Sequence, residues 1–266
     1  MPIFLILISH LASVTAQEVE DESEFDYRRG SEKGPGKWGE LKKEWAACKN
    51  GGMQSPIDLS NRRVKIIPKL GMLKNSYQPG NATLKNRGHD ISLQWEMGKA
   101  GSIYLNGSEY LLQQCHWHSP SEHTINGRRY DMELHMVHMS QDTSVKHKIA
   151  VVGLLYKIGP PDAFLSKLMG HVTPMSDEKE GKNMGMINPQ EIKLGGKKYY
   201  RYMGSLTVPP CTEGVVWTLN KKLSTVSREQ VNLLREAVHD YAEENARPVQ
   251  ALNSREIHFY DPNPED

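Results

Sequence analysis

Short strand-like runs of apolar and polar residues alternate with turns in the chain from Val64 to Trp95. Residues 91–95, Ile-Ser-Leu-Gln-Trp, alternate with a period of two, which is typical of a strand with one buried face. Residues 149–157 form a continuous apolar run, as expected for a strand buried on both faces. Asn106-Gly107 and Asn126-Gly127 mark tight turns, the first within a predicted hairpin over 103–118 and the second before a strand over 131–139.

Helical patterns are few and short. Asp162 can cap a helix that extends to Met169. Ser227 and Gln230 form a capping box. Apolar residues follow it at helical spacing: Val231, Leu234, Val238 and Tyr241. The pattern predicts an α+β domain dominated by strands, with helices on the outside.

Composition narrows the class of protein. The chain has 266 residues, a length that suits one large domain or two small ones. Its formal net charge of +1 predicts no binding to nucleic acid or to an anionic membrane. Neither an internal repeat nor a low-complexity tract is present, and no apolar stretch is long enough to span a bilayer. Residues 25–60 are rich in Gly, Pro and Lys and are predicted to form an irregular arm.

Residues 1–16 resemble a secretion signal, which would leave residues 17–266 as a single domain. Pro2–Leu7 is apolar, and the segment ends Val14-Thr15-Ala16, with small residues at the cleavage positions. The alternative is a buried first strand. We favour the signal, and so the secretory pathway, because the acidic residues 17–24 that follow are unsuited to a core strand.

The three cysteines and two glycosylation motifs fit that route. An odd count in a secreted chain suggests one disulfide and one free thiol. Cys115 faces away from the residues on either side of it, whereas Cys48 and Cys211 lie in loops rich in Gly and Pro, so they are the better pair. Asn81 and Asn106 each begin an acceptor triplet for N-glycosylation.

Histidines cluster between Gln114 and His138. Side chains alternate along a strand, so His116 and His118 share a face, as do Glu133 and His135. If the two strands pair, three imidazoles meet, which is the donor set of a catalytic zinc with an open position. Glu133 could fix the far ring nitrogen of a ligand. The alternative is that each histidine is an ordinary hydrogen-bonded core residue.

Several stretches together resemble the α-class carbonic anhydrases, particularly the secretory-pathway forms of plants. They occur in family order across nearly the whole of residues 17–266: Gln54-Ser-Pro-Ile57, Arg87-Gly-His89, Gln114-Cys-His-Trp-His118, Ser121-Glu-His-Thr124, Glu133-Leu-His-Met-Val-His138, Gly204-Ser-Leu-Thr-Val-Pro-Pro210 and Ala246-Arg-Pro-Val-Gln250. The resemblance implies a large central, mostly antiparallel twisted sheet of about ten strands with short peripheral helices, and zinc at the base of a conical cleft. It also implies cis peptide bonds before Pro56 and Pro210.

The resemblance further implies the reversible hydration of carbon dioxide to bicarbonate and a proton. His116, His118 and His135 match the Zn2+ ligands, with Glu133 and Gln114 as the hydrogen-bonding partners of His135 and His116. Hydroxide held by the zinc would be the nucleophile, oriented by Thr207 and Glu122. His89 matches the residue that shuttles the proton to solvent.

An apolar wall for carbon dioxide is implied in the same way, by Val137, Val151, Leu206, Val215 and Trp217. Val208 stands where the family often has threonine, and Arg87 and Ser92 replace asparagines common in animal forms. These departures concern the substrate-side polar contacts and the water network rather than the reaction.

Other functions remain open alternatives. Storage relatives in plants keep the fold but lose a zinc histidine, so a storage or binding protein with a relict zinc site is the second hypothesis; all three histidines are kept here. A zinc peptidase is disfavoured because no His-Glu-x-x-His motif occurs. We expect a monomer or weak homo-oligomer, located outside the cell (the apoplast) or in a plastid reached through the secretory pathway.

Overall fold

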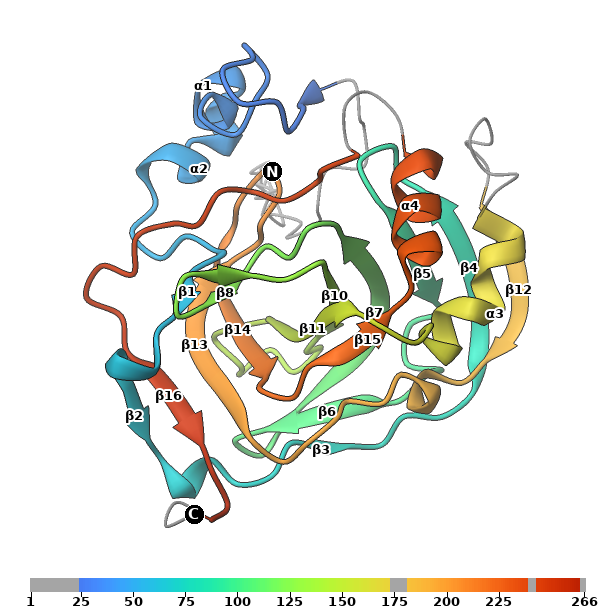
Figure 1. The fold of residues 1–266 in the computed structure, drawn as a ribbon. Helices are drawn as coiled ribbons and strands as arrows, with labels where there is room; N and C mark the ends of the chain where they lie inside the picture. Colours follow the sequence, from blue (N-terminus) through green and yellow to red (C-terminus); the bar gives the residue numbers. More distant parts are fainter. Residues whose placement is uncertain (1–23, 173–180, 239–242, 264–266) are drawn as a thin grey trace, which may run out of the picture.

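One large twisted sheet organises the protein. A computed structural model describes residues 24–172, 181–238 and 243–263, and within them 13 strands form this sheet (Figure 1). Ten of the strands follow one path, in the order β12-β4-β5-β7-β10-β11-β14-β13-β16-β2. The signal predicted over residues 1–16 lies outside the described residues.

The strands of this path are β12 (Lys182–Ile187), β4 (Gly80–Asn86), β5 (Ile91–Trp95), β7 (Ser108–His118), β10 (Met132–Met139), β11 (Ile149–Ile158), β14 (Glu213–Asn220), β13 (Tyr199–Ser205), β16 (Ile257–Tyr260) and β2 (Val64–Ile66). Three more strands join from the side: β15 (Ser224–Val226) pairs with β11, and β3 (Lys74–Asn75) pairs with β6 (Ser102–Leu105), which also pairs with β7. A second, small sheet contains β1 (Asp58–Leu59), β8 (Thr124–Ile125) and β9 (Arg128–Arg129). The helices are α1 (Trp38–Leu41), α2 (Ala47–Asn50), α3 (Ala163–Val172) and α4 (Arg228–Ala237), with single 3-10 turns η2 (Lys43–Trp45), η3 (Asn61–Arg63), η4 (Pro68–Leu70) and η6 (Pro189–Glu191).

Most neighbouring strands of the large sheet are antiparallel. The parallel contacts are those of β11 with β14 and β15, and of β16 with β2. The expected α+β class with a mostly antiparallel central sheet is therefore confirmed, and the ten-strand path matches the expected size.

The register at the centre of the sheet brings the histidine-rich strands together. β7 and β10 are antiparallel neighbours, with His116 opposite His135 and His118 opposite Glu133. A register shift follows at Val137. Because alternate residues share a face, this pairing places all three imidazoles on one side of the sheet.

The β6–β7 hairpin begins this arrangement. Asn106 and Gly107 both have positive φ, at 50° and 84°. A two-residue hairpin turn needs that conformation, which asparagine tolerates and glycine adopts without a steric penalty. The hairpin predicted from this dipeptide is therefore confirmed.

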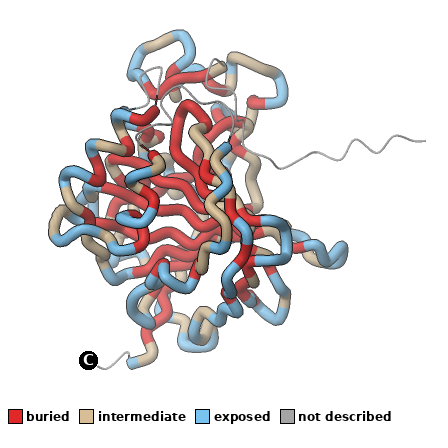
Figure 2. Tube along the Cα trace, turned by 90° about the vertical axis from the view of Figure 1, so that its right-hand side faces the viewer, coloured by how far each residue is buried: buried red, intermediate tan, exposed pale blue. Residues whose placement is uncertain are grey.

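Each face of the sheet packs its own apolar cluster. On β10, Leu134 and Met136 point into the larger cluster, whereas Val137 points into the smaller one. The larger cluster continues under α3 and α4 through residues such as Leu168 and Leu234. Figure 2 shows the buried strands crossing the middle of the molecule with exposed loops around them.

Both long helices lie on the outside, beside β4, β5 and β12 (Figure 1). Asp162 caps α3, accepting a hydrogen bond from Leu165 N at 2.7 Å, and the predicted capping box begins α4. Gln230 of that box also donates to Asp162 O at 2.9 Å, which joins the two helices. Among the described residues, no helix has the length and apolar character needed to cross a membrane.

The segment predicted as an irregular arm contains short helices, which corrects that expectation. Trp38 of α1 and Trp45 of η2 are almost fully buried and anchor this segment to the core. Trp38 Nε1 donates to the carbonyls of Asp26 and Lys33, at 3.1 and 3.0 Å. The prediction of an irregular arm rested on the abundance of Gly, Pro and Lys and did not take the burial of Trp38 and Trp45 into account.

Covalent features tie this arm to the sheet. Cys48 and Cys211, paired from the sequence, form a disulfide with Cα atoms 5.0 Å apart, and Cys115 is free and buried. The peptide bonds before Pro56 and Pro210 are cis, as the resemblance implied. A third cis bond, before Pro120, was not expected.

The capping box gives a test of helix α4. Ser227 Oγ accepts from Gln230 N at 3.2 Å, so Ser227→Ala leaves that N–H without its partner. We expect the free energy of unfolding in urea to fall by about 1 kcal/mol. The matched control is Ser60→Ala, because Ser60 precedes η3 without a side-chain cap and should change stability by only a few tenths. Equal losses in the two variants would mean that the box does not stabilise α4.

Candidate metal centre

Three buried imidazoles converge on the face of β7 and β10 that carries the smaller cluster. One ring nitrogen from each of His116, His118 and His135 lies within 4.8 Å of the other two. The ring centroids are 4.6–5.1 Å apart, and each residue is at most 2% exposed. The grouping expected from alternation along two paired strands is therefore present.

The outer nitrogen of each ring faces a hydrogen-bond acceptor. His116 Nδ1 is 2.8 Å from Gln114 Oε1, and His135 Nε2 is 2.8 Å from Glu133 Oε1. His118 Nδ1 is 2.7 Å from the carbonyl oxygen of Asn245. Because these acceptors require N–H donors, the outer nitrogens carry the protons. The inner nitrogens, Nε2 of His116 and His118 and Nδ1 of His135, present lone pairs to the shared space.

Burial keeps two of the rings neutral. It lowers the pKa of His116 well below its usual value and also lowers the pKa of His135, for which Glu133 partly offsets the effect. His118 differs: burial lowers its pKa, but Glu122 and Asp90 outweigh that effect and raise it. Neutral imidazoles are the form that binds a metal ion.

Two buried polar atoms at the centre, a ring nitrogen and a carboxylate oxygen, lack hydrogen-bond partners among the described residues. His118 Nε2 and Glu122 Oε2 lie 3.7 Å apart, and neither has a hydrogen-bond partner within the described part of the chain. Buried polar atoms are normally satisfied. A cation bound by the three nitrogens, with a water near the carboxylate, would satisfy both, so this donor set fits a zinc ion.

The Glu133 carboxylate makes hydrogen bonds with two imidazoles and two backbone N–H groups. Its Oε1 contacts His135 and also His123 Nδ1, at 2.7 Å, while its Oε2 accepts from the backbone N–H groups of Glu122 and His123. Burial alone would raise the pKa of Glu133, but His123 and His135 lower it well below its usual range. The carboxylate is therefore ionised and fully hydrogen-bonded.

His123 is a functional residue that the sequence analysis missed. Its Nε2 is 2.7 Å from Tyr202 Oη, which in turn contacts Ser55 Oγ at 2.7 Å. Three buried side chains thus link Glu133 to β13 and to the segment before β1. The Ser121–Thr124 motif contains His123, but loop spacing does not reveal which way a side chain points.

Asn245 and Arg247 close the site from the C-terminal part of the chain. Besides its carbonyl contact with His118, Asn245 donates from Nδ2 to the carbonyls of Trp117 and His89. Arg247 N donates to Glu122 Oε1 at 2.9 Å, and its guanidinium bonds Gln54 and two carbonyls, including that of Cys48. A backbone carbonyl has no sequence signal, so the role of Asn245 could not be predicted.

The two residues expected to orient the nucleophile, Thr207 and Glu122, are only partly assembled. Thr207 is buried in the loop after β13, and Glu122 is fully buried. Arg247 N occupies Glu122 Oε1, and Oε2 accepts no hydrogen bond from the described residues. A bond from the Thr207 hydroxyl to Oε2 is therefore not formed in this structure, and the pairing stays a prediction.

The predicted apolar wall lies beside the imidazoles. All five of its residues belong to the smaller cluster: Val137, Val151, Leu206, Val215 and Trp217. The Trp217 ring is 4.8 Å from the rings of both His123 and His135. Val208, which stands where the family often has threonine, packs in the larger cluster.

His89 is buried rather than exposed. It is only 2% exposed, and its ring lies 5.1 Å from that of Phe25. Its Nε2 is 3.5 Å from Asp90 Oδ2. Asp90 in turn accepts from Arg87 Nε at 2.7 Å, so His89 lies beside a buried ion pair.

Comparisons with known proteins agree with this geometry. The profile of the eukaryotic-type carbonic anhydrase family matches residues 33–261. Alpha carbonic anhydrase 7 of Arabidopsis thaliana is 56% identical over 261 residues, covering 98% of this chain and 93% of the relative. Carbonic anhydrase Nec1 of Nesocodon mauritianus is 54% identical over 259 residues, covering 97% and 93%.

Among solved structures, the crystal structure of dioscorin complexed with ascorbate is similar with a TM-score of 0.85. The two sequences are 44% identical, and the match covers 90% of this chain and 98% of that one. Dioscorin DB3L of Dioscorea polystachya is also 46% identical over 257 residues, covering 96% of this chain and 93% of the relative.

The ion pair beside His89 makes stability depend on pH. Burial would raise the pKa of Asp90, but Arg87 and His89 lower it far below its usual range. A depressed pKa means that the carboxylate stabilises the fold above the unfolded value of about 4 and stops doing so as the pH falls through the folded value. Asp90→Asn should lower the free energy of unfolding by about 3 kcal/mol at pH 7. Chemical denaturation at several pH values should show the difference from wild type narrowing below pH ~4; a gap that stays constant would show that the charge is not responsible.

Proposed function

Because the chain belongs to the eukaryotic-type carbonic anhydrase family, we propose that it catalyses the zinc-dependent, reversible hydration of carbon dioxide to bicarbonate and a proton. The observation that carries the proposal is the convergence of three buried imidazole nitrogens whose outer nitrogens are each fixed by an acceptor. Two inner nitrogens on β7 and one on β10 would hold the ion.

Each partner of an outer nitrogen has a defined task. Gln114, the Asn245 carbonyl and Glu133 hold the rings in the tautomer that leaves the inner nitrogens free. Zinc bound there supplies a water whose pKa falls to about 7, a value already established for this enzyme family. Glu133 is ionised, so its hydrogen bond with His135 also makes that ring a stronger electron-pair donor to a metal ion.

Glu122 and Thr207 would orient the attacking oxygen. An ionised carboxylate only accepts hydrogen bonds, and Arg247 N already occupies Oε1. The Thr207 hydroxyl would donate to Oε2, which leaves its lone pairs to accept from the attacking oxygen. A lone pair of that oxygen then points at the substrate carbon, which supports reaction by orientation.

Carbon dioxide would bind against the apolar wall. Val137, Val215 and Trp217 are at most 8% exposed and lie on the same face as the imidazoles. An apolar linear molecule gains from such a surface because it makes few hydrogen bonds with water. Val208, packed in the other cluster, would affect the loop that carries Thr207 rather than the substrate itself.

His89 would receive the proton and release it to solvent. An imidazole titrates near neutral pH, which suits this task. Because the ring is buried beside Phe25, release requires that this side chain move away or that the imidazole turn outward.

The second candidate function is that of a storage or binding protein on the same fold. The similarity to dioscorin supports it, and the complete imidazole triad with Glu122 and Thr207 supports the enzyme instead. We further propose passage through the secretory pathway, to the apoplast or a plastid, as a monomer or weak homo-oligomer. The disulfide and the exposure of Asn81 and Asn106 are compatible with that route.

The proposed reaction is tested with Thr207→Ala. Wild type should bind one zinc per chain and hydrate carbon dioxide in stopped flow, and a chelator should abolish both. The variant should keep its zinc but lose about 100-fold in hydration, because Thr207 orients rather than ligates. Thr143→Ala, at an exposed loop position, is the matched control and should behave as wild type.

Two outcomes of that experiment would contradict the proposal. Zinc-loaded wild type without hydration activity would favour the storage function. Parallel loss of zinc and activity in Thr207→Ala would make the role of the hydroxyl structural.

The shuttle role of His89 is tested in dilute buffer. His89→Ala should lower maximal turnover by about 100-fold, and added imidazole should restore part of it, because a diffusible base can replace the side chain. Binding of zinc should not change. His258→Ala, which removes a partly exposed histidine elsewhere, serves as the control. Full turnover of His89→Ala without added base would mean that the proton leaves by another route.

A further inference from the structure

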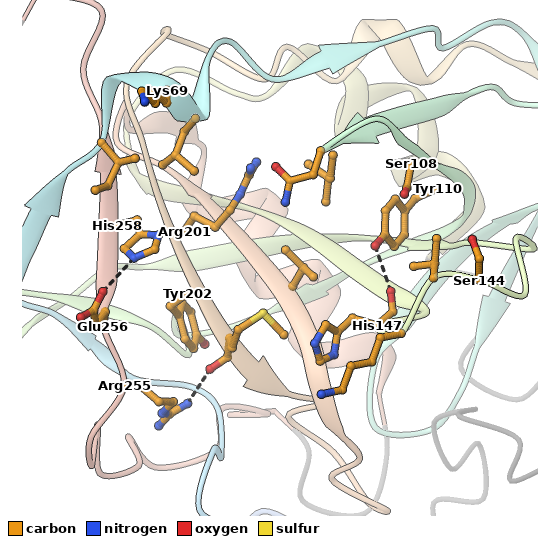
Figure 3. A pocket seen from close by; sticks show the side chains of 18 residues that line it. Lys69, Ser108, Tyr110, Ser144, His147, Arg201, Tyr202, Arg255, Glu256 and His258 are labelled. Atoms are coloured by element: carbon orange, nitrogen blue, oxygen red, sulfur yellow. Dashed lines mark hydrogen bonds and ion pairs between the residues drawn. The ribbon is translucent and has the colours of Figure 1, made fainter.

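A cavity lies outside the candidate metal centre. It has a volume of about 770 Å³ and is lined by residues of η4, the β6–β7 hairpin, the loop before β11, and strands β13, β14 and β16 (Figure 3). Three consecutive residues of β13 line it, Arg201, Tyr202 and Met203, and Tyr202 also packs in the cluster beside the imidazoles. His116, His118 and His135 are not part of the lining, so a ligand in the cavity would not contact the candidate metal ligands.

The size and lining of this cavity suit a small molecule. Ligand pockets for small molecules measure roughly 300–1,000 Å³ and are mostly apolar with a few polar groups. Apolar side chains form much of the lining: Ile67, Leu70, Leu105, Val145, Met203 and Val216. The Tyr110 ring adds a flat surface, which is held in place because its hydroxyl donates to the His147 carbonyl at 2.9 Å.

Arg201 is the feature that points to the charge of the ligand. It is 8% exposed, and Figure 3 shows its side chain reaching into the cavity. Its Nε and Nη2 donate to the Thr218 hydroxyl at 3.2 and 3.1 Å, and its guanidinium stacks on Tyr199. Neither contact carries negative charge, and within the described residues no carboxylate forms an ion pair with it. A buried cation without a counter-ion destabilises the fold, so an anion in the cavity would be favoured.

The other charged groups strengthen this preference. Lys69 and Lys146 line the cavity and are exposed, so they are available to an incoming anion. Among the described residues of the lining, Glu256 is the one acidic side chain, and it is already engaged by Lys65 and by His258, at 3.1 Å.

Arg255 contributes charge but few free donors. Its guanidinium bonds the carbonyls of Met203, Gln54, Leu252 and Ala251. The anionic end of a ligand is therefore expected near Arg201 and Lys69 rather than near Arg255.

We propose that this cavity is a binding site for a small organic anion with a flat apolar body. The anionic group pairs with Arg201 and Lys69, and the apolar body packs against Tyr110 and Val216. The ligand would contact none of the three imidazoles, so binding of the anion does not require zinc.

Asn106 connects this site to glycosylation. It is exposed and belongs both to the acceptor triplet and to the rim of the cavity. A glycan attached there stands at the cavity mouth. Binding is therefore measured on full-length protein made in a host without N-glycosylation, and then on protein that carries the glycan.

The probe is 2-naphthoate, with the neutral 2-naphthamide as its matched control, titrated by calorimetry into zinc-loaded protein. We expect one molecule of naphthoate per chain and at least about tenfold weaker binding of the amide, because a charge-assisted hydrogen bond is lost. Arg201→Gln should weaken naphthoate binding by about tenfold or more. Arg228→Gln, which removes an exposed arginine of α4 outside the cavity, should leave it unchanged.

A second variant keeps the test decisive if Arg201→Gln does not fold. Lys69→Gln combined with Lys146→Gln changes only exposed side chains and should weaken binding about fivefold. Binding that survives both sets of substitutions, that is equal for acid and amide, or that disappears only when zinc is removed would overturn the proposal. Loss of binding in the glycosylated protein alone would support it, because the rim would then control access.

Discussion

The carboxylate of Glu133 is the constraint on which the metal centre depends. It is completely buried, and a buried charge is tolerated only when its oxygens are satisfied. Four donors do so: two imidazoles and two consecutive backbone N–H groups. The same four bonds fix the orientation of His135 and the path of the loop that carries Glu122. One ionised group thus aligns a proposed zinc ligand with the group proposed to orient the attacking oxygen.

Strand pairing and the His123–Tyr202 contact connect Glu133 to the rest of the large sheet. Because β7 and β10 are neighbours in register, Glu133 lies opposite His118 and two pairs away from the His116–His135 pair. His123 carries the network on to Tyr202 of β13, across the strands that form the apolar wall. The opposite face of the same strands carries different residues, among them Arg201 and Val216. One backbone arrangement therefore supports two surfaces of different chemistry, an imidazole cluster and a cationic cavity.

Much of the centre was predictable because strand geometry is simple. Alternation along two strands and one pairing bring His116, His118 and His135 together, and the Asn-Gly turn predicts the hairpin that leads into β7. Groups placed by loops or by the backbone escaped prediction. The Asn245 carbonyl has no side-chain signature, and the direction of His123 depends on a loop beside a cis-proline bond. The buried tryptophans of the arm were masked by the polar composition around them, and the burial of His89 depends on Phe25, 64 positions earlier in the chain.

The contact between Asn245 and His118 has a consequence for the order of events during synthesis. A ribosome releases the chain from its N-terminus, so β7 and β10 emerge long before Asn245 and Arg247. Until those late residues arrive, the outer nitrogen of His118 has no acceptor and Glu122 lacks the N–H of Arg247. The strands can pair early, but the imidazole cluster acquires its final hydrogen bonds only after the segment that carries Asn245 and Arg247 has been translated. Maturation of the centre is thereby coupled to the synthesis of a segment more than 100 residues after β10.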